Sequence, residues 1–255
     1  MSNTPEPTKR FTERVDNYVK YRPGYPIEVL DLLENEGRLN GNSAVADIGS
    51  GTGIFTKLVL QRGYKVYAVE PNQAMQQAAR MWLGSDENFV PVDAVAEATT
   101  LATHSIDIVV CAQAFHWFNG ARTRWEFNRI LKQDGVAALI WNNRLPDTDD
   151  FSKAYEKLLK TESVDYNKVN HRNIGDIDFK AFFKNGVYKQ VNFPNVQVFN
   201  LDGLMGRAFS SSYVPPESSN DGAKFKGLLK DIFAKYNANG TVTFSYQTEV
   251  YIGKV

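Results

Sequence analysis

An acidic residue and three closely spaced glycines stand where a short apolar run ends. The stretch AVADIGSGTG holds Asp47, Gly49, Gly51 and Gly53. Glycines in a turn between a strand and a helix let backbone N–H groups approach a ligand. Glu70 ends a second apolar run, 19 residues beyond Gly51, where a carboxylate can accept hydrogen bonds from ribose hydroxyls. The spacing predicts a nucleotide-binding loop, and the alternative is a tight turn beside a surface glutamate.

The charge of this loop discriminates between two kinds of nucleotide. The dinucleotide fingerprint G-x-G-x-x-G would require glycine at the position of Ile54. Asp47 would repel a pyrophosphate but would favour a cationic ligand such as S-adenosyl-L-methionine (SAM), which carries a sulfonium and an amino group. The loop therefore favours SAM. An NAD-dependent Rossmann oxidoreductase and a non-catalytic SAM-binding protein remain the alternatives.

Composition narrows the range of partners. The 255-residue chain is 43% hydrophobic, which is enough for one sizeable core. Its 29 basic and 29 acidic residues balance, whereas nucleic-acid-binding proteins normally show a basic excess. The single cysteine, Cys111, excludes an internal disulfide framework. No apolar run approaches the roughly 20 residues of a membrane span, and the N-terminal stretch lacks a signal-peptide core. We expect a soluble, cytoplasmic protein without a nucleic-acid partner, a membrane partner or a metal site.

Strand-like and helix-like segments alternate along much of the chain. Short apolar strands are expected at 44–48, 65–69, 88–92, 106–112 and 136–141. Helices are expected at 26–33, 54–62, from about 71, and at 122–133, 151–162 and 223–236. Pro194 restricts a strand at 190–199 to a sheet edge or a strand end, and strict alternation over 241–252 predicts an antiparallel strand at or near the edge. The pattern predicts an α/β fold: a Rossmann-like seven-stranded, mostly parallel sheet with helices on both faces and an antiparallel last strand.

The chain resembles the class I SAM-dependent methyltransferases, and within them the small-molecule subgroup of type 11 and trans-aconitate-like methyltransferases. The resemblance spans residues 10–145 and rests on D-x-G-x-G-x-G with Glu70, YVKYRPGYP at 18–26, VEPNQAM at 69–75 and AQAFHWF at 112–118. The C-terminal third matches only in outline. We expect one domain over 1–255, with a core of about 36–143 and 187–255, an N-terminal lid at 10–35 and helical cap insertions at about 144–186 and 200–222.

The resemblance implies a set of cofactor-binding residues. The loop residues Gly49, Ser50, Gly51 and Gly53 would approach the methionine and ribose parts of SAM, with Asp47 near its amino group and Glu70 on the ribose hydroxyls. Pro71 and Asn72 would start the next helix, Met75 would pack near adenine, and Gln113 would lie beneath the methionine part. Two registers could hold adenine: the pair Asp93-Ala94, or VAEA at 95–98 with Val95 and the backbone N–H of Ala96. We favour the second.

The acceptor side is expected around AFHWF, because ligands of open α/β sheets lie at the carboxyl ends of the strands. His116 is interpreted as a substrate-orienting group or a general base; the alternative is a packed aromatic corner. The other candidates that face the acceptor or form the lid are Phe115, Trp117, Tyr18, Tyr21, Arg22 and Arg144. Arg144 would meet an anionic substrate or be solvated, and YVKYRPGYP could instead be a solvated linker. The predicted activity is methyl transfer by in-line displacement to a small-molecule acceptor, with a carboxylate as one candidate.

Overall fold

A computed structural model describes residues 20–164, 166 and 174–255. Its sheet has the strand order β3-β2-β1-β4-β5-β7-β6. The strands are β1 (Ala44–Ile48), β2 (Lys65–Val69), β3 (Phe89–Val92), β4 (Ile106–Ala112), β5 (Leu131–Arg144), β6 (Lys189–Phe199) and β7 (Val242–Gly253). Strands β1 to β5 pair in parallel, and β7 is antiparallel to both of its neighbours. The predicted fold class is confirmed: β6, which contains Pro194, is an edge strand, and the last strand β7 lies next to it.

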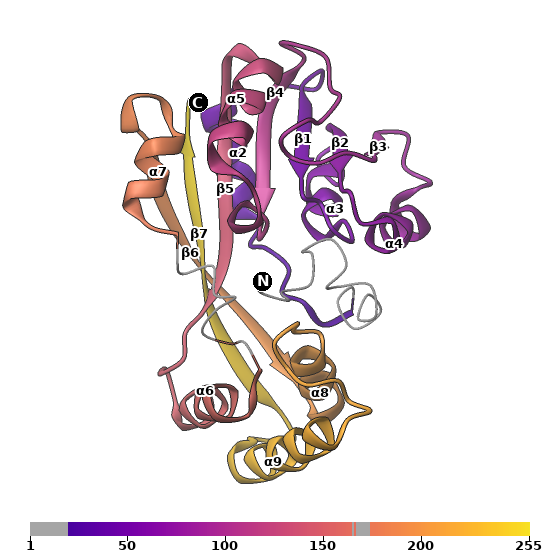
Figure 1. Cartoon of the computed structure of the whole chain (residues 1–255), viewed down its shortest axis with the longest axis vertical. Helices are drawn as coiled ribbons and strands as arrows, with labels where there is room; N and C mark the ends of the chain where they lie inside the picture. Colours follow the sequence, from indigo (N-terminus) through magenta and orange to yellow (C-terminus); the bar gives the residue numbers. More distant parts are fainter. Residues whose placement is uncertain (1–19, 165, 167–173) are drawn as a thin grey trace, which may run out of the picture.

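Helices cover both faces of the sheet (Figure 1). On one face α2 (Glu28–Gly37), α3 (Ile54–Leu60) and α4 (Gln73–Leu83) pack their apolar sides onto one buried cluster. On the other face α5 (Gly120–Ile130) and α7 (Asp176–Phe182) pack onto a second cluster. Successive residues of a strand point to opposite faces of the sheet, so Val45 belongs to the first cluster and Ala46 to the second. The carboxyl ends of the parallel strands are thereby held at one edge.

Three helices pack together in a separate lobe, at the bottom of Figure 1, which we call the cap. They are α6 (Asp150–Glu162), α8 (Leu201–Phe209) and α9 (Asn220–Tyr236). Their core is a third cluster that includes Tyr155, Phe225 and Phe244. Strands β6 and β7 reach this lobe because they have 11 and 12 residues, against five in β1. The strands thus belong to both the sheet and the cap.

The boundary between core and cap differs from the expected one. Helix α7 lies within the expected insertion 144–186, yet its Phe179 stacks on Tyr251 of the sheet at 4.1 Å between ring centroids. Helix α9 lies within the expected core 187–255, yet Phe225 and Leu229 are buried in the cap. Sequence periodicity shows which side of a helix is apolar but not which surface it covers.

Helix α8 lies within the expected helical insertion 200–222, although it contains Gly203 and Gly206, which weaken a helix. Asn200 caps its start by accepting a hydrogen bond from the Gly203 N–H at 2.9 Å. A side chain at position 206 would collide with the Tyr21 ring. The glycine therefore lets the chain segment 20–26 lie directly on α8. In the described part of the chain, no helix is long and apolar enough to cross a membrane.

Candidate functional site

The glycine loop joins β1 to α3 at the carboxyl edge of the sheet. The Gly49 and Ser50 N–H groups donate to the Val69 carbonyl at 2.8 and 3.1 Å, which fixes the loop beside β2. Gly49 has a φ of +72°, and a Cβ there would lie 2.5 Å from the Ala114 Cβ. Both the backbone conformation and the close approach therefore require glycine at this position. Gly51 also has a positive φ, of +56°.

Glu70 is held at the tip of β2 by backbone donors. Its Oε2 accepts from the Gly51 N–H at 2.9 Å and its Oε1 from the Asn72 N–H at 2.8 Å. The Asn72 side chain in turn caps α4 by accepting from the Met75 N–H at 3.1 Å. Burial raises the pKa of Glu70, and the two backbone hydrogen bonds partly offset this rise. Each carboxylate oxygen keeps a further acceptor site, so the fixed carboxylate can receive two neighbouring hydroxyls.

Asp47 is fully buried at the end of β1. Its Oδ2 accepts from the Thr56 hydroxyl at 2.6 Å, whereas its Oδ1 has no hydrogen-bond partner among the described residues. Burial raises the pKa of Asp47 to about 7; the Thr56 hydrogen bond opposes this rise and the nearby charge of Glu70 adds to it. A buried acceptor without a partner is costly in a folded protein. A cationic ligand that donates to Oδ1 would remove this cost.

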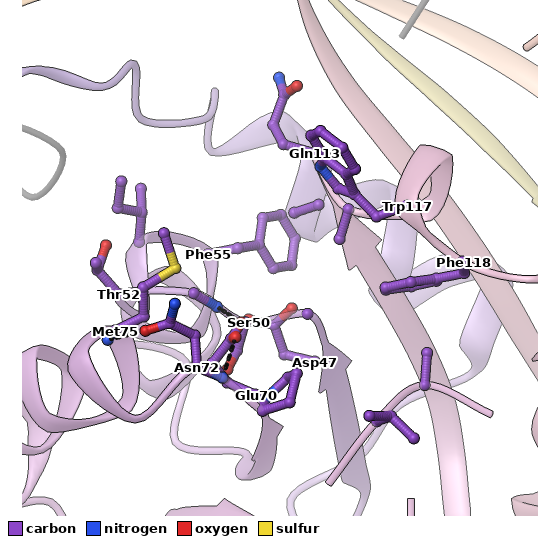
Figure 2. Close-up of a pocket in the computed structure, with 18 of the residues that line it drawn as sticks. Asp47, Ser50, Thr52, Phe55, Glu70, Asn72, Met75, Gln113, Trp117 and Phe118 are labelled. Atoms are coloured by element: carbon purple, nitrogen blue, oxygen red, sulfur yellow. Dashed lines mark hydrogen bonds between the residues drawn. The ribbon is translucent and has the colours of Figure 1, made fainter. Parts of the chain in front are cut away.

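These groups open into one cavity of about 230 Å³ (Figure 2). Twelve of the residues expected from the sequence line it: Asp47, Gly49, Ser50, Gly51, Glu70, Pro71, Asn72, Met75, Val95, Ala96, Gln113 and Trp117. Of the two registers considered after β3, Val95, Ala96 and Glu97 of VAEA lie at the cavity wall, whereas neither Asp93 nor Ala94 is among the lining residues. The lining residues that were not named individually as candidates from the sequence are Tyr25, Thr52, Ile54, Phe55, Glu97, Ala112, Ala114 and Phe118.

The loop after β4 divides its aromatic residues between the cavity and the core. A single 3₁₀ turn, Phe115–Trp117, points successive side chains in different directions. Trp117 lines the cavity, whereas Phe115 is buried against Phe182 at 4.7 Å between ring centroids. His116 is not among the cavity-lining residues, and its Nδ1 accepts from the Trp141 indole N–H at 3.5 Å. Gly53 is also set back, because it starts α3 against the Leu83 side chain.

The segment 20–26 connects the cap with the cavity. Its Tyr21 ring lies on α8, and the Arg22 Nη2 donates to the Ser210 carbonyl at 2.9 Å. Its Tyr25 ring meets the Phe55 ring edge-on at 5.0 Å and lines the cavity. Tyr18, which was expected in the lid, lies outside the described residues.

Arg144 lies at the end of β5 and points into the cap rather than into the cavity. It forms an ion pair with Glu156, whose Oε2 also accepts from the Tyr166 hydroxyl at 2.8 Å. The guanidinium also lies over the Tyr155 ring, 5.0 Å from its centroid. This arginine is therefore already engaged with a carboxylate of the protein.

The sequence of this chain is similar to those of known methyltransferases. Residues 46–139 match the family model of a methyltransferase domain, Methyltransf_11. A methyltransferase-like protein of Schizosaccharomyces pombe is 33% identical over 59% of this chain and 58% of its own length. An uncharacterized methyltransferase of Mycobacterium bovis is 37% identical over 52% of each chain. The matches thus span little more than half the length of these relatives.

Solved structures share the fold at low identity. A candidate type II methyltransferase from Anaeromyxobacter dehalogenans superposes with a TM-score of 0.67 and 18% identity, covering 92% of this chain and 98% of the other. The fold and the loop define a class I SAM-dependent methyltransferase domain, a class whose cofactor is SAM. Residues 46–139 belong to the Methyltransf_11 family.

Proposed function

We propose that this protein is a SAM-dependent methyltransferase that acts on a small-molecule acceptor. The observation that carries the proposal is the pair of buried carboxylates in one cavity. Asp47 presents an oxygen without a partner, and Glu70 presents two oxygens fixed by backbone donors. One acid suits an ammonium group and the other suits a ribose, a combination that SAM contains and that a pyrophosphate-containing dinucleotide does not satisfy.

The remaining contacts to the cofactor follow from the lining of the cavity. The loop from Gly49 to Gly51 would contact the methionine part, and Asp47 its amino group. The N–H of Ala96 would read the adenine edge, while Met75 would pack against the adenine plane. When bound, SAM supplies a methyl group on a positively charged sulfur. The fit rests on the unpartnered Asp47 Oδ1 and on the close approach that glycine permits at position 49.

The protein's contribution would be positioning and exclusion of water. Tyr25 and Phe55 form one aromatic wall of the cavity. Trp117 and Phe118 line it from the loop after β4 (Figure 2). Aromatic faces favour a nearby cation, and orientation of two reactants can supply roughly 7–11 kcal/mol of a barrier at best.

His116 is better suited to orient an acceptor than to deprotonate it. Its Nδ1 accepts from the Trp141 indole, so the neutral ring carries its proton on Nε2. That nitrogen can donate a hydrogen bond to an acceptor oxygen. For His116 to serve as a general base through Nε2, the contact with Trp141 would have to break and the ring change tautomer.

Two findings support a small acceptor. The formal net charge of zero is unlike that of a nucleic-acid-binding protein. A fold neighbour, the phosphoethanolamine N-methyltransferase 2 of Haemonchus contortus, was solved with phosphomonomethylethanolamine and S-adenosylhomocysteine; it has a TM-score of 0.53 and 16% identity over 96% of this chain and 58% of its own.

The proposal is tested by titrating the protein with SAM, S-adenosylhomocysteine and NADH in a calorimeter, followed by a screen for transfer of labelled methyl to a metabolite extract. We expect both sulfur nucleosides to bind and NADH not to bind. Glu70→Ala should abolish binding, while Glu87→Ala, an exposed acid outside the cavity, should not. Tight NADH binding without SAM binding would refute the assignment. Cofactor binding without transfer to any acceptor would refute catalysis.

A further inference from the structure

Two asparagine side chains from different strands meet at one backbone carbonyl of the segment 20–26. Asn142 of β5 and Asn195 of β6 each donate a side-chain N–H to the Gly24 carbonyl, at 3.0 and 2.9 Å. The two donors lie 118 and 171 residues from Gly24 along the chain. A carbonyl oxygen has two acceptor sites, so both sites are filled by side chains that only the folded sheet brings together.

A network of hydrogen bonds holds both amides in place. The Asn142 Oδ1 accepts from the Thr248 hydroxyl at 2.5 Å and from the Asn195 Nδ2 at 3.2 Å. Asn142 is only 6% exposed, and Thr248 is fully buried. Buried polar groups need partners, and a network whose members bond one another is rigid. The two amide N–H groups are therefore directed at Gly24 and are not free to rotate.

The antiparallel part of the sheet brings this network to the edge where the cofactor cavity lies. Strand β5 pairs with β4 as far as Ile140, and its next residues pair with β7. Asn142 lies opposite Thr248 in this extension, and Asn195 lies one strand further out, on β6. In Figure 1 the segment 20–26, in indigo, runs between the sheet and the cap. The long strands β5, β6 and β7 thus reach a segment that the short parallel strands do not.

The place of this anchor within the segment decides which side chain it positions. A proline fixes its own φ and restricts the residue before it to an extended conformation. In the sequence RPGYP, Pro23 and Pro26 therefore restrict every residue except Gly24, which is the residue that both amides hold. The Gly24 carbonyl lies in one peptide plane with the nitrogen and Cα of Tyr25. Anchoring the carbonyl therefore sets the direction in which the Tyr25 side chain leaves the backbone.

Tyr25 is the residue through which the described segment 20–26 lines the cofactor cavity. Its ring meets the Phe55 ring edge-on, with 5.0 Å between the centroids. Phe55 is buried in the first turn of α3, directly after the glycine loop. An aromatic ring attracts a cation only within about 6 Å of its centroid. A ring that recognises a cationic cofactor must therefore be held in position.

We propose that Asn142 and Asn195 are positioning residues for SAM, because they hold Gly24 so that the Tyr25 ring recognises the sulfonium. This inference rests on the proposed methyltransferase function and extends the cofactor site to strands β5 and β6. Neither asparagine is among the residues that line the cavity, so their effect on the cofactor passes through Tyr25. A network with only a structural role would instead affect every ligand of the cavity equally.

The test compares two ligands that differ in one charge. SAM carries a sulfonium, whereas S-adenosylhomocysteine has a neutral sulfur and keeps the amino acid, the ribose and the adenine. Both are titrated calorimetrically into the wild type, Asn142→Ala and Asn195→Ala. We expect each variant to weaken SAM binding about three- to tenfold more than S-adenosylhomocysteine binding, which is the scale of a partly desolvated cation–π contact.

A matched control lies on the same strand. Asn192 is exposed on β6 and accepts a hydrogen bond from the Gln190 side chain at 3.4 Å. Asn192→Ala should leave the ratio of the two affinities unchanged. Asn195 is only half-buried, so Asn195→Ala decides the test even if the more buried Asn142→Ala fails to fold.

Further variants test whether the ring transmits the effect. Tyr25→Leu should lower the affinity for SAM relative to S-adenosylhomocysteine as much as Asn195→Ala does, whereas Tyr25→Phe, which keeps the ring, should not. Combining Tyr25→Leu with Asn195→Ala should change the ratio no further, because both substitutions remove the same contact.

Equal weakening of both ligands in the asparagine variants, unchanged affinities, or additive effects in the double variant would overturn the positioning role. Each of these results would leave the proposed function intact, since the wild type would still bind SAM. Absence of SAM binding in the wild type would instead defeat the proposed function. The two failures are distinguishable, because wild-type affinity is measured separately from the ratio in the variants.

Discussion

The affinity for SAM should rise with pH through about pH 7, and Asp47→Asn should remove that rise. Asp47 is buried with one oxygen lacking a partner, and burial raises its pKa to about 7. The protonated carboxyl cannot pair with an ammonium group, whereas the carboxylate can. Binding of the SAM amino group should therefore require the deprotonated form.

The size of the change in SAM affinity follows from the fractions of Asp47 that are protonated and ionised at each pH. With a pKa of about 7, roughly a tenth of Asp47 is ionised one unit below that pKa and roughly nine tenths one unit above it. The apparent dissociation constant varies inversely with the competent fraction. The affinity should therefore increase about tenfold between pH 6 and pH 8, provided that other groups contribute little.

The stability of the ligand-free protein should change in the opposite direction. The pKa of Asp47 is higher in the folded chain than the ordinary value of 3.8, so the folded state holds a proton that the unfolded state has lost between pH 4 and pH 7. The stability contributed by protonated Asp47 is therefore fully present below about pH 4 and is lost as the pH rises through about 7. About three pH units at roughly 1.4 kcal/mol each give a contribution on the order of 4 kcal/mol.

The assay is calorimetric titration with S-adenosylhomocysteine at pH 6, 7 and 8, for the wild type and Asp47→Asn. S-adenosylhomocysteine keeps the amino group and lacks the sulfonium, so it isolates the contact with Asp47. Glu70, whose pKa is also raised by burial, is retained in the variant and controls for a second titration. A flat profile in the wild type, or the same slope in Asp47→Asn, would refute the reasoning.

Three further changes test the site. Glu70→Gln should weaken SAM binding about 10- to 100-fold in calorimetry, because charged acceptors for two hydroxyls are lost; equal affinity would remove Glu70 from the ribose site. Gly49→Ala should lower the melting temperature by several degrees, since φ is +72° and its Cβ would meet Ala114; an unchanged melting curve contradicts this. His116→Ala should reduce turnover and leave SAM affinity unchanged. A loss of SAM affinity without a loss of turnover per bound cofactor would show that His116 has only a structural role.

The parallel part of the fold was predictable because its strands are buried on both sides. Such strands are nearly continuous apolar runs, and the predicted limits of β1, β2 and β4 match the structure. The loops that follow them must meet at one edge, and most of the residues that the family resemblance implied lie on those loops around the cavity. Trp117 and His116 show the limit of that rule. They are neighbours in one turn of 3₁₀ helix, yet Trp117 lines the cavity and His116 contacts Trp141 instead.

The cap was less predictable because its contacts are distant in sequence. No signal in the sequence pointed to the burial of Arg207 on α8, since an arginine in a glycine-containing segment is normally exposed. Its burial depends on Tyr246, 39 residues further along the chain. Likewise, the Tyr21 ring, from the other end of the chain, explains the glycine at position 206. Local periodicity carries no information about such pairs.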